Sequence, residues 1–217
     1  SRIASGDVTD IRAEGDAPAA DLTAFGRIDL SAGQDATLGN GAVTGGSLAV
    51  IQIDAGSDNN PSFPLYDPQY NAAITGTVTS TGNVRVFAGG NAAFRSGSST
   101  SADNRVEVQT GDDIIVESGA TISAGVNPGT APNPSDPFND QAIVNLNAGG
   151  LGPSLLSPIL TPISSIIVAG TLEATNTAVV LNADAIDGLG GAINASSISA
   201  DVNNAPPNGV VQSDDAG

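Results

Sequence analysis

The chain has 217 residues, which is enough for one ordinary domain or one stretch of a repeat array. It carries 23 acidic residues against six arginines and no lysine, so its formal net charge is −17. The absence of Cys and His excludes disulfides, zinc–thiolate sites, thiol nucleophiles, Ser-His-Asp triads and histidine-ligated metals. The acidic balance argues against nucleic acid and anionic membranes as partners, and no apolar run is long enough for membrane insertion.

The composition favours a folded, all-β chain over a disordered one. Apolar residues make up 40% of the sequence and charged residues only 13%, whereas disordered acidic chains have fewer aliphatics and more charge. Aromatic residues are scarce at 3%, so the core has to be built from Val, Ile, Leu and Ala. The first residues show neither Met nor an apolar leader segment. We therefore expect either a removed signal peptide or a segment of a longer chain.

One pattern recurs along the chain: two apolar residues one position apart, then a small residue and a glycine. The alternation is that of a strand with one buried face, and the glycine indicates a turn. The pattern predicts strands that end in such turns at residues 28–33, 51–56, 84–89, 106–111 and 144–149, with an Asp-ending variant at 179–184 and a shorter relative at 166–170. A second set of strands is predicted at residues 76–81, 119–124 and 170–175.

The spacing of these turns indicates a solenoid. The closing glycines are Gly33, Gly56, Gly89, Gly111, Gly149 and Gly170. Two of the intervals between them are long, and these contain proline-rich segments at 59–70 and 126–140. Removing the segments as loops restores a period of about 22 residues throughout. In a longer-range match, 26–33 is similar to 82–89, and the similarity continues with Leu38 and Phe94 and with Gly41 and Gly97.

These observations predict an all-β fold, a right-handed parallel β-helix with rungs of about 22 residues. The helix is expected over residues 1–200, with loop insertions at 59–70, 126–140 and 151–162, and residues 201–217 are expected to form a linker or disordered tail. Stacked rungs would bury a column of Ile28, Ile51, Val84, Val106 and Val144. An immunoglobulin-type sandwich is the alternative all-β fold.

The repeat Val84-Arg85-Val86-Phe87-Ala88-Gly89-Gly90-Asn91 and its relatives resemble the filamentous-haemagglutinin-type repeats of giant bacterial surface adhesins. The resemblance implies a secreted, elongated protein without enzymatic activity. We therefore expect a structural fibre or adhesin protein located extracellularly or at the cell surface. Neither end of the sequence shows a polar cap, so the expected partners are the chain itself or adjacent repeats, end to end. A surface glycan or host receptor is a further expected partner.

The alternative is a polysaccharide-degrading enzyme on the same kind of helix. The segment Gly111-Asp112-Asp113 resembles the Gly-Asp-Asp segment of polygalacturonases, which implies acid–base hydrolysis by Asp112 and Asp113. That family's Gly-His-Gly and Arg-x-Lys segments have no counterpart here, because the chain lacks His and Lys. Gly-Asp-Asp also begins structural turns, in which Asp accepts backbone hydrogen bonds. We therefore assign no catalytic residue.

Two further sets of residues are candidates for binding. The segment around Asp184 and Asp187 is the nearest approach to a calcium site, although neither an EF-hand nor a Gly-Gly-x-Gly-x-Asp repeat is present. No cofactor is expected beyond weakly bound Ca²⁺. Phe63, Tyr66 and Tyr70 bring three of the seven aromatic residues into one proline-rich loop. Aromatic rings stack on sugars, so this loop is the predicted ligand contact.

Overall fold

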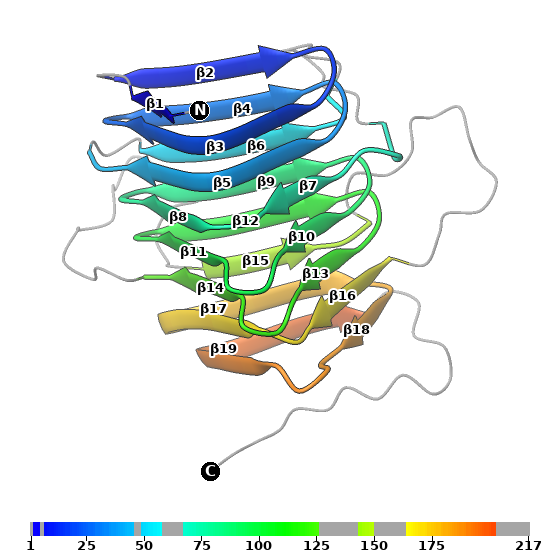
Figure 1. Cartoon of the computed structure of the whole chain (residues 1–217). Coiled ribbons are helices and arrows are strands. Elements are labelled where there is room, and N and C mark those ends of the chain that lie inside the picture. Colours follow the sequence, from blue (N-terminus) through cyan, green and yellow to red (C-terminus); the bar gives the residue numbers. More distant parts are fainter. Residues whose placement is uncertain are drawn as a thin grey trace.

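A computed structural model describes residues 2–4, 7–45, 49–57, 67–125, 143–149 and 164–202 of the protein. All regular elements in these ranges are β-strands, and the strand pairings between them are parallel. The chain winds as a right-handed parallel β-helix that adds one strand to each of three stacks per turn (Figure 1). No strand pair within these ranges is antiparallel, so the alternative sandwich is not formed by the described residues. No helix in the described ranges is long and apolar enough to cross a membrane.

Stack A contains the strands with the recurring apolar pattern. Its strands follow one another from the N-terminal to the C-terminal end of the β-helix. They are β2 (Val8–Ala13), β4 (Arg27–Ala32), β6 (Val50–Ala55), β9 (Asn83–Ala88), β12 (Arg105–Thr110), β15 (Ile143–Asn147) and the second halves of β17 (Thr171–Ala183) and β19 (Ala192–Val202).

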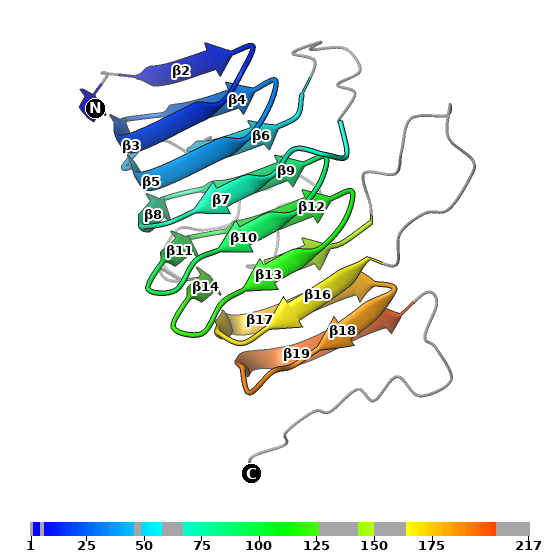
Figure 2. The same ribbon diagram turned by 45° about the vertical axis from the view of Figure 1, so that its right-hand side comes forward.

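Stack B consists of shorter strands, which face the viewer in Figure 2. They are the first halves of β3 (Ala17–Ala24) and β5 (Ala36–Val43), then β7 (Ala72–Ile74), β10 (Ala92–Phe94), β13 (Ile114–Val116), β16 (Ser165–Val168) and β18 (Ala185–Asp187). Stack C completes each turn. It contains β1 (Arg2–Ala4), the second halves of β3 and β5, β8 (Thr77–Ser80), β11 (Ser99–Ala102), β14 (Thr121–Ala124) and the first halves of β17 and β19.

The interior is filled by rows of identical or similar aliphatic side chains. The strand register places Ile28, Ile51, Val84, Val106 and Val144 one above another, which confirms the predicted column. All five side chains are fully excluded from solvent. Burying each one contributes about 1.5–3 kcal/mol. A lone rung has no neighbour against which to bury this row, so the stacking of rungs itself stabilises the fold.

Where no insertion intervenes, the rungs are close to the predicted period of about 22 residues, and the first is shorter. In stack A, Val8 pairs with Arg27, 19 residues on, Arg27 with Val50, 23 residues on, and Asn83 with Arg105, 22 residues on. Register partners lie further apart in sequence where the chain passes through the three predicted insertions. The strands on either side of these insertions keep their register.

Parts of the predicted boundaries can be compared with the structure. Residues 59–66 of the first insertion, and the whole of 126–140 and 151–162, lie outside the described residues. Strand β19 extends to Val202, past the predicted start of the tail at residue 201. The remainder of the predicted tail, 203–217, also lies outside the described residues.

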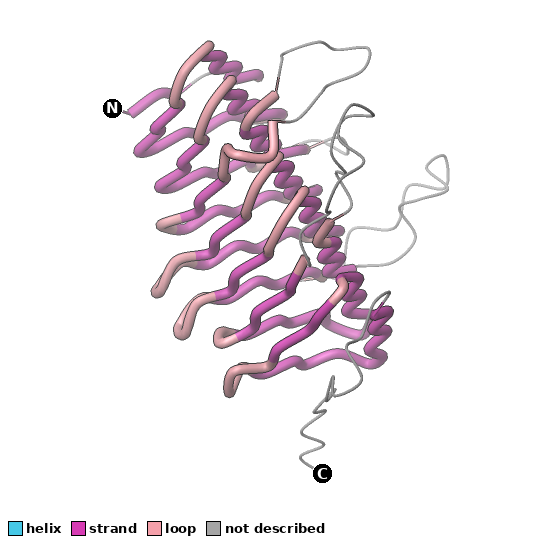
Figure 3. The backbone as a smooth tube through the Cα atoms, turned by 90° about the vertical axis from the view of Figure 1, so that its right-hand side faces the viewer, coloured by secondary structure: helices cyan, strands magenta, loops and turns pink. Residues whose placement is uncertain are grey.

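Two predicted equivalences are wrong, because glycines occupy more than one kind of position along a turn of the β-helix. The other closing glycines follow strands of stack A, whereas Gly170 follows β16 in stack B, where an added Cβ would collide with the Ala120 carbonyl oxygen. Gly41 is a strand residue paired with Val78, whereas Gly97 lies in a turn with φ of +79°. The corner between stacks B and C is continuous strand in β3 and β5 and becomes a loop in later turns (Figure 3).

Candidate functional site: a carboxylate ladder and a polar groove

A ladder of Asp and Asn side chains runs along the corner between stacks A and B. In each step a side-chain oxygen accepts the backbone N–H of the residue at the equivalent position in the next turn. The described residues make five such bonds, each named here with the acceptor side chain first and the donor amide second: Asp16 accepts from Asp35 (3.3 Å), Asp35 accepts from Asn71 (2.7 Å), Asn71 accepts from Asn91 (2.9 Å), Asn91 accepts from Asp113 (2.9 Å), and Asp113 accepts from Ser165 (2.7 Å). We call these five acceptors the Asx ladder. It gives partners to amides that the chain leaves unpaired as it bends between stacks.

The candidate catalytic pair lies at the end of this ladder. Asp113 is its last acceptor, so one oxygen of the carboxylate is already committed to the backbone of Ser165. Asp112 precedes it in the turn, where the Thr110 hydroxyl donates to the Asp112 carbonyl at 2.9 Å. The pKa of Asp112 is raised, chiefly by burial and further by the negative charge of Asp113. The hydrogen bond from Ser165 therefore gives Asp113 a structural role between stacked rungs. Of the properties of this pair, only the raised pKa of Asp112 suits a general acid.

The candidate calcium ligands do not converge with other carboxylates. One oxygen of Asp184 accepts hydrogen bonds from the backbone N–H and the hydroxyl of Ser164, at 3.1 and 3.2 Å. Asp187 is exposed at the end of β18. Across the described part of the chain, no group of three or more acidic side chains is placed to hold a metal ion. Asp184 therefore has a backbone-capping role comparable to that of the Asx ladder.

Only one residue of the predicted aromatic loop can be placed. Phe63 and Tyr66 lie outside the described residues, and Tyr70 is half-buried in the turn that precedes β7. The Tyr70 carbonyl accepts the Gly90 N–H at 2.7 Å, and the Tyr70 N–H donates to the Asp67 carbonyl at 3.3 Å. The backbone of Tyr70 thus connects adjacent turns, and its role in ligand contact stays a prediction.

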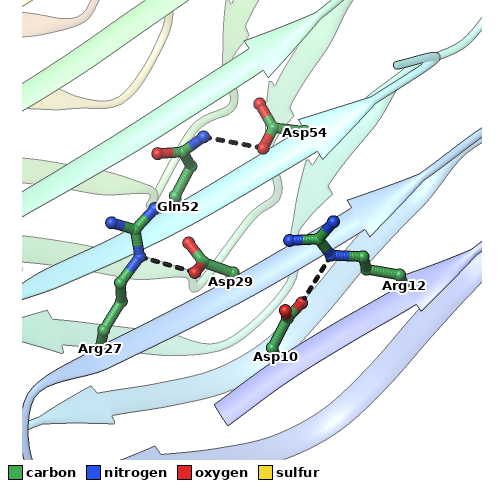
Figure 4. Close-up of polar contacts among 6 residues, drawn as sticks. All are labelled: Asp10, Arg12, Arg27, Asp29, Gln52 and Asp54. Atoms are coloured by element: carbon green, nitrogen blue, oxygen red, sulfur yellow. Dashed lines mark hydrogen bonds and ion pairs between the residues drawn. The ribbon is translucent and has the colours of Figure 1, made fainter. Parts of the chain in front are cut away.

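The outward side of stack A, which we call face A, carries four of the six arginines among acidic partners. Arg12 Nε donates to Asp10 at 3.1 Å, and Arg27 Nε donates to Asp29 at 2.6 Å (Figure 4). The hydrogen bond to Asp29 raises the pKa of Arg27, which keeps the guanidinium charged. Further along face A, Arg85 and Arg105 both approach Glu107, at 3.6 and 3.9 Å.

Register explains this arrangement. Asp10 and Asp29 are direct partners in adjacent rungs, and their like charges would repel at the strand spacing of about 4.8 Å. An arginine two positions away on the same strand neutralises each of them. Asp29 and Arg85 occupy the same outward row through Gln52, as the match between 26–33 and 82–89 predicted. Face A is therefore nearly neutral, and most of the chain's negative charge lies elsewhere.

An open groove of about 440 Å³ lies on the outward side of stack C, which we call face C. It forms where β3, β5 and β8 meet, and its floor has little side-chain volume because the outward residue of β5 between Thr23 and Thr79 is Ala42. The adjoining corner is tightly packed, because a Cβ on Gly39 would collide with the Ala20 carbonyl oxygen. Polar side chains surround the floor: Asp21, Thr23, Asn40, Thr77 and Thr79.

The sequence analysis missed both the Asx ladder and the groove. A signal for the ladder is present, since four of its five members directly precede an alanine that begins a stack B strand. The groove has a weaker signal, because its residues come from three turns with different corner lengths. Comparisons of the chain with protein-family models, curated proteins and solved structures gave no match. The functional interpretation therefore rests on the residues and their geometry.

Proposed function

We propose that this chain is a structural, non-enzymatic part of an extracellular or cell-surface fibre or adhesin. The Asx ladder is the observation that carries the proposal. Its carboxylates and amides connect successive turns of the backbone, and they include Asp113 of the hydrolase-like Asp-Asp pair. The side chains of the Asx ladder thus stabilise an elongated stack of turns. The resemblance to adhesin repeats, described above from the sequence, supports the same function.

The last described turn supports an end-to-end partner. Ile198 belongs to the row of Val144 and Val179, which are fully buried, yet it is 51% exposed. A further rung of the same kind, from an adjacent repeat or from a second copy of the chain, would bury it. In the register of stack A, a second copy's β2 would place Arg12 beside Asp201. Opposite charge would then favour that register.

The polygalacturonase-like alternative has the raised pKa of Asp112 in its favour, so the first test is catalytic. The purified chain and its Asp112→Asn variant are incubated with polygalacturonate, and reducing ends are measured. We expect neither protein to release sugar above the background of buffer alone. Release by the wild type that is lost in Asp112→Asn would contradict the proposal.

The second test concerns adhesion. The fluorescently labelled chain is mixed with whole bacterial cells and with immobilised cell-wall polysaccharide, and retained protein is measured after washing. A charge-matched acidic protein of similar size serves as the control. We expect retention of the chain above this control. Retention no greater than the control on every surface would contradict an adhesive role.

A further inference from the structure

The groove on face C has unused hydrogen-bonding capacity. Asp21 Oδ1 accepts a bond from Asn40 Nδ2 at 2.7 Å, and Asn40 Oδ1 accepts the Thr77 N–H at 2.8 Å. These contacts fix the two side chains but leave the second Asp21 oxygen and one Asn40 N–H available. Within the described part of the chain, the hydroxyls of Thr77 and Thr79 make no hydrogen bond either. Hydroxyl, amide and carboxylate groups together supply both donors and acceptors.

Two rows of hydroxyl groups extend the groove along the β-helix axis. Strand register aligns Thr77 with Ser99, Thr121 and Thr171, and it aligns Thr79 with Ser101 and Ser123. Successive members of a row lie about 4.8 Å apart, the spacing of neighbouring strands. Neither row contains a charged side chain until Glu173 follows Ser123. The polar surface between the groove and Glu173 is therefore regular and uncharged.

An exposed aromatic residue lies close to the groove in sequence. Phe25 comes two positions after the groove residue Thr23, in the turn that follows β3. Its side chain is 57% exposed, and its ring lies directly over Gly45 of the next turn, where even a Cβ would collide with it. An exposed ring held in this way offers an apolar surface beside the polar groups. Phe25 is the only large exposed aromatic residue in the described ranges.

These features together match one class of ligand. A neutral sugar chain presents hydroxyls that both donate and accept hydrogen bonds, and it presents C–H surfaces that pack on an aromatic ring. An acidic polymer would instead be repelled by the net charge of −17 and by Asp21. We propose that the groove formed by Asp21, Asn40, Thr77 and Thr79, together with the exposed ring of Phe25, binds a neutral oligosaccharide. The inference rests on the proposed adhesive function and assigns its ligand class.

The sugar chain lies along the rows of hydroxyl groups, parallel to the β-helix axis. In this orientation successive sugar units meet equivalent groups on successive turns. Each single hydrogen bond at such an exposed site is weak, and affinity arises from their number and from the ring contact. Removing the Thr77 and Thr79 hydroxyls should therefore weaken binding without changing the fold.

Affinity electrophoresis tests the proposal, since a chain of charge −17 migrates readily in native gels. The gels contain xyloglucan, galactomannan or mixed-linkage glucan as neutral probes, and polygalacturonate as the acidic probe. The proteins are the wild type, the double variant Thr77→Val with Thr79→Val, Phe25→Ala, and Ala42→Trp, which fills the groove floor. Thr37→Val, on the outward side of stack B, is the matched control. Circular dichroism melts of all variants report whether the fold is retained.

We expect at least one neutral polysaccharide to retard the wild type and Thr37→Val equally. The double variant and Phe25→Ala should bind about tenfold more weakly, and Ala42→Trp should not be retarded. Lack of retardation by every neutral probe, or equal retardation of Ala42→Trp and the wild type, would overturn the proposal. Retardation by polygalacturonate alone would also overturn it.

The adhesion test on whole cells separates this inference from the proposed function. If the groove variants adhere to cells as strongly as the wild type, the groove assignment is wrong and the adhesive function stands. If the wild type itself is retained no better than the acidic control protein, both fail. Reduced adhesion of Ala42→Trp together with unchanged adhesion of Thr37→Val supports both.

Discussion

The carboxylate of Asp113 accepts the backbone N–H of Ser165 at 2.7 Å, although the two residues are 52 positions apart in the sequence. The bond connects the stack B strands β13 and β16, which are adjacent in space although two insertions separate them along the chain. Asp113 also donates its own backbone N–H to Asn91, so it takes part in two successive hydrogen bonds of the ladder. A residue that resembles part of a hydrolytic pair thus connects three consecutive turns.

Asp113→Ala should destabilise the fold by about 1–3 kcal/mol, because the Ser165 amide loses its acceptor. Asp113→Asn should cost clearly less, since an amide oxygen serves the same purpose at Asn71 and Asn91. Urea unfolding followed by circular dichroism measures both. Equal losses for the two variants would show that the charge of Asp113, rather than its acceptor oxygen, is what matters.

Asp112 and Glu117 should give opposite changes in the pH dependence of stability. Burial raises the pKa of Asp112, so its favourable contribution is present below its ordinary pKa of about 3.9 and is lost as pH rises through the raised value. Asp112→Asn should therefore unfold at a higher urea concentration than the wild type at pH 7. The gain should disappear on acidification to below about pH 3.9.

The pKa of Glu117 is changed in the opposite direction to that of Asp112. The hydrogen bond from Arg95 at 2.6 Å, followed by the Ser96 N–H, lowers the pKa of Glu117. Its contribution is present above the ordinary value of about 4.3 and is lost as pH falls through the lowered pKa. Glu117→Gln should thus be less stable than the wild type at pH 7 and approach it in acid. Urea unfolding at several pH values measures both variants, and changes of the same sign would contradict this account.

The row of Ile51 and Ile198 offers a matched pair of core truncations. Both side chains point inward in the same row of stack A, but Ile51 is fully buried and Ile198 is 51% exposed. Ile51→Ala should cost about 2–5 kcal/mol, and Ile198→Ala less than about 1 kcal/mol in dilute solution. Sedimentation at high protein concentration and high salt extends the test, because salt screens the repulsion between copies. If copies stack end to end, Ile198→Ala should associate less than the wild type, and equal association would count against stacking.

Two glycines provide a test of corner packing. A Cβ on Gly89 would collide with the Asp67 carbonyl oxygen, whereas a Cβ on Gly188 would meet nothing within 4 Å. Gly89→Ala should therefore lower the melting temperature markedly, because a backbone carbonyl has to move. Gly188→Ala should leave it almost unchanged. A similar melting temperature for the two variants would show that the corner at Gly89 is less tightly packed than described.

The strands of stack A could be predicted because their signal is local. Alternating apolar residues followed by a small residue and glycine identify each strand, and the regular spacing is enough to place Val84 and Val106 in one row. The corners were less predictable. Glycine satisfies tight packing at the corners after both stack A and stack B, so Gly170 resembled a member of a series to which it does not belong.

The candidate site depended on longer-range information. The bond from Ser165 to Asp113 spans two insertions, and sequence spacing alone does not show which amide a given carboxylate meets. Likewise, Thr77 and Thr79 were recognised as strand residues, but the groove beside them exists because β5 places the small outward residue Ala42 next to Thr79. Strands can be predicted from local alternation of apolar residues, whereas predicting the site requires the register between turns.

The register of the turns can be measured directly, because the chain has no cysteine of its own. Ser101 and Ser123 are register partners in stack C, so their Cα atoms lie about 4.8 Å apart, within the range that a disulfide bridges. Thr121 lies one rung away from Ser101 and two positions along the strand, which is too far. We predict that the double variant Ser101→Cys with Ser123→Cys forms an intramolecular disulfide under mild oxidation, while Ser101→Cys with Thr121→Cys does not. Efficient cross-linking of the second pair and not the first would contradict the stacked-rung account on which the ladder and the groove both depend.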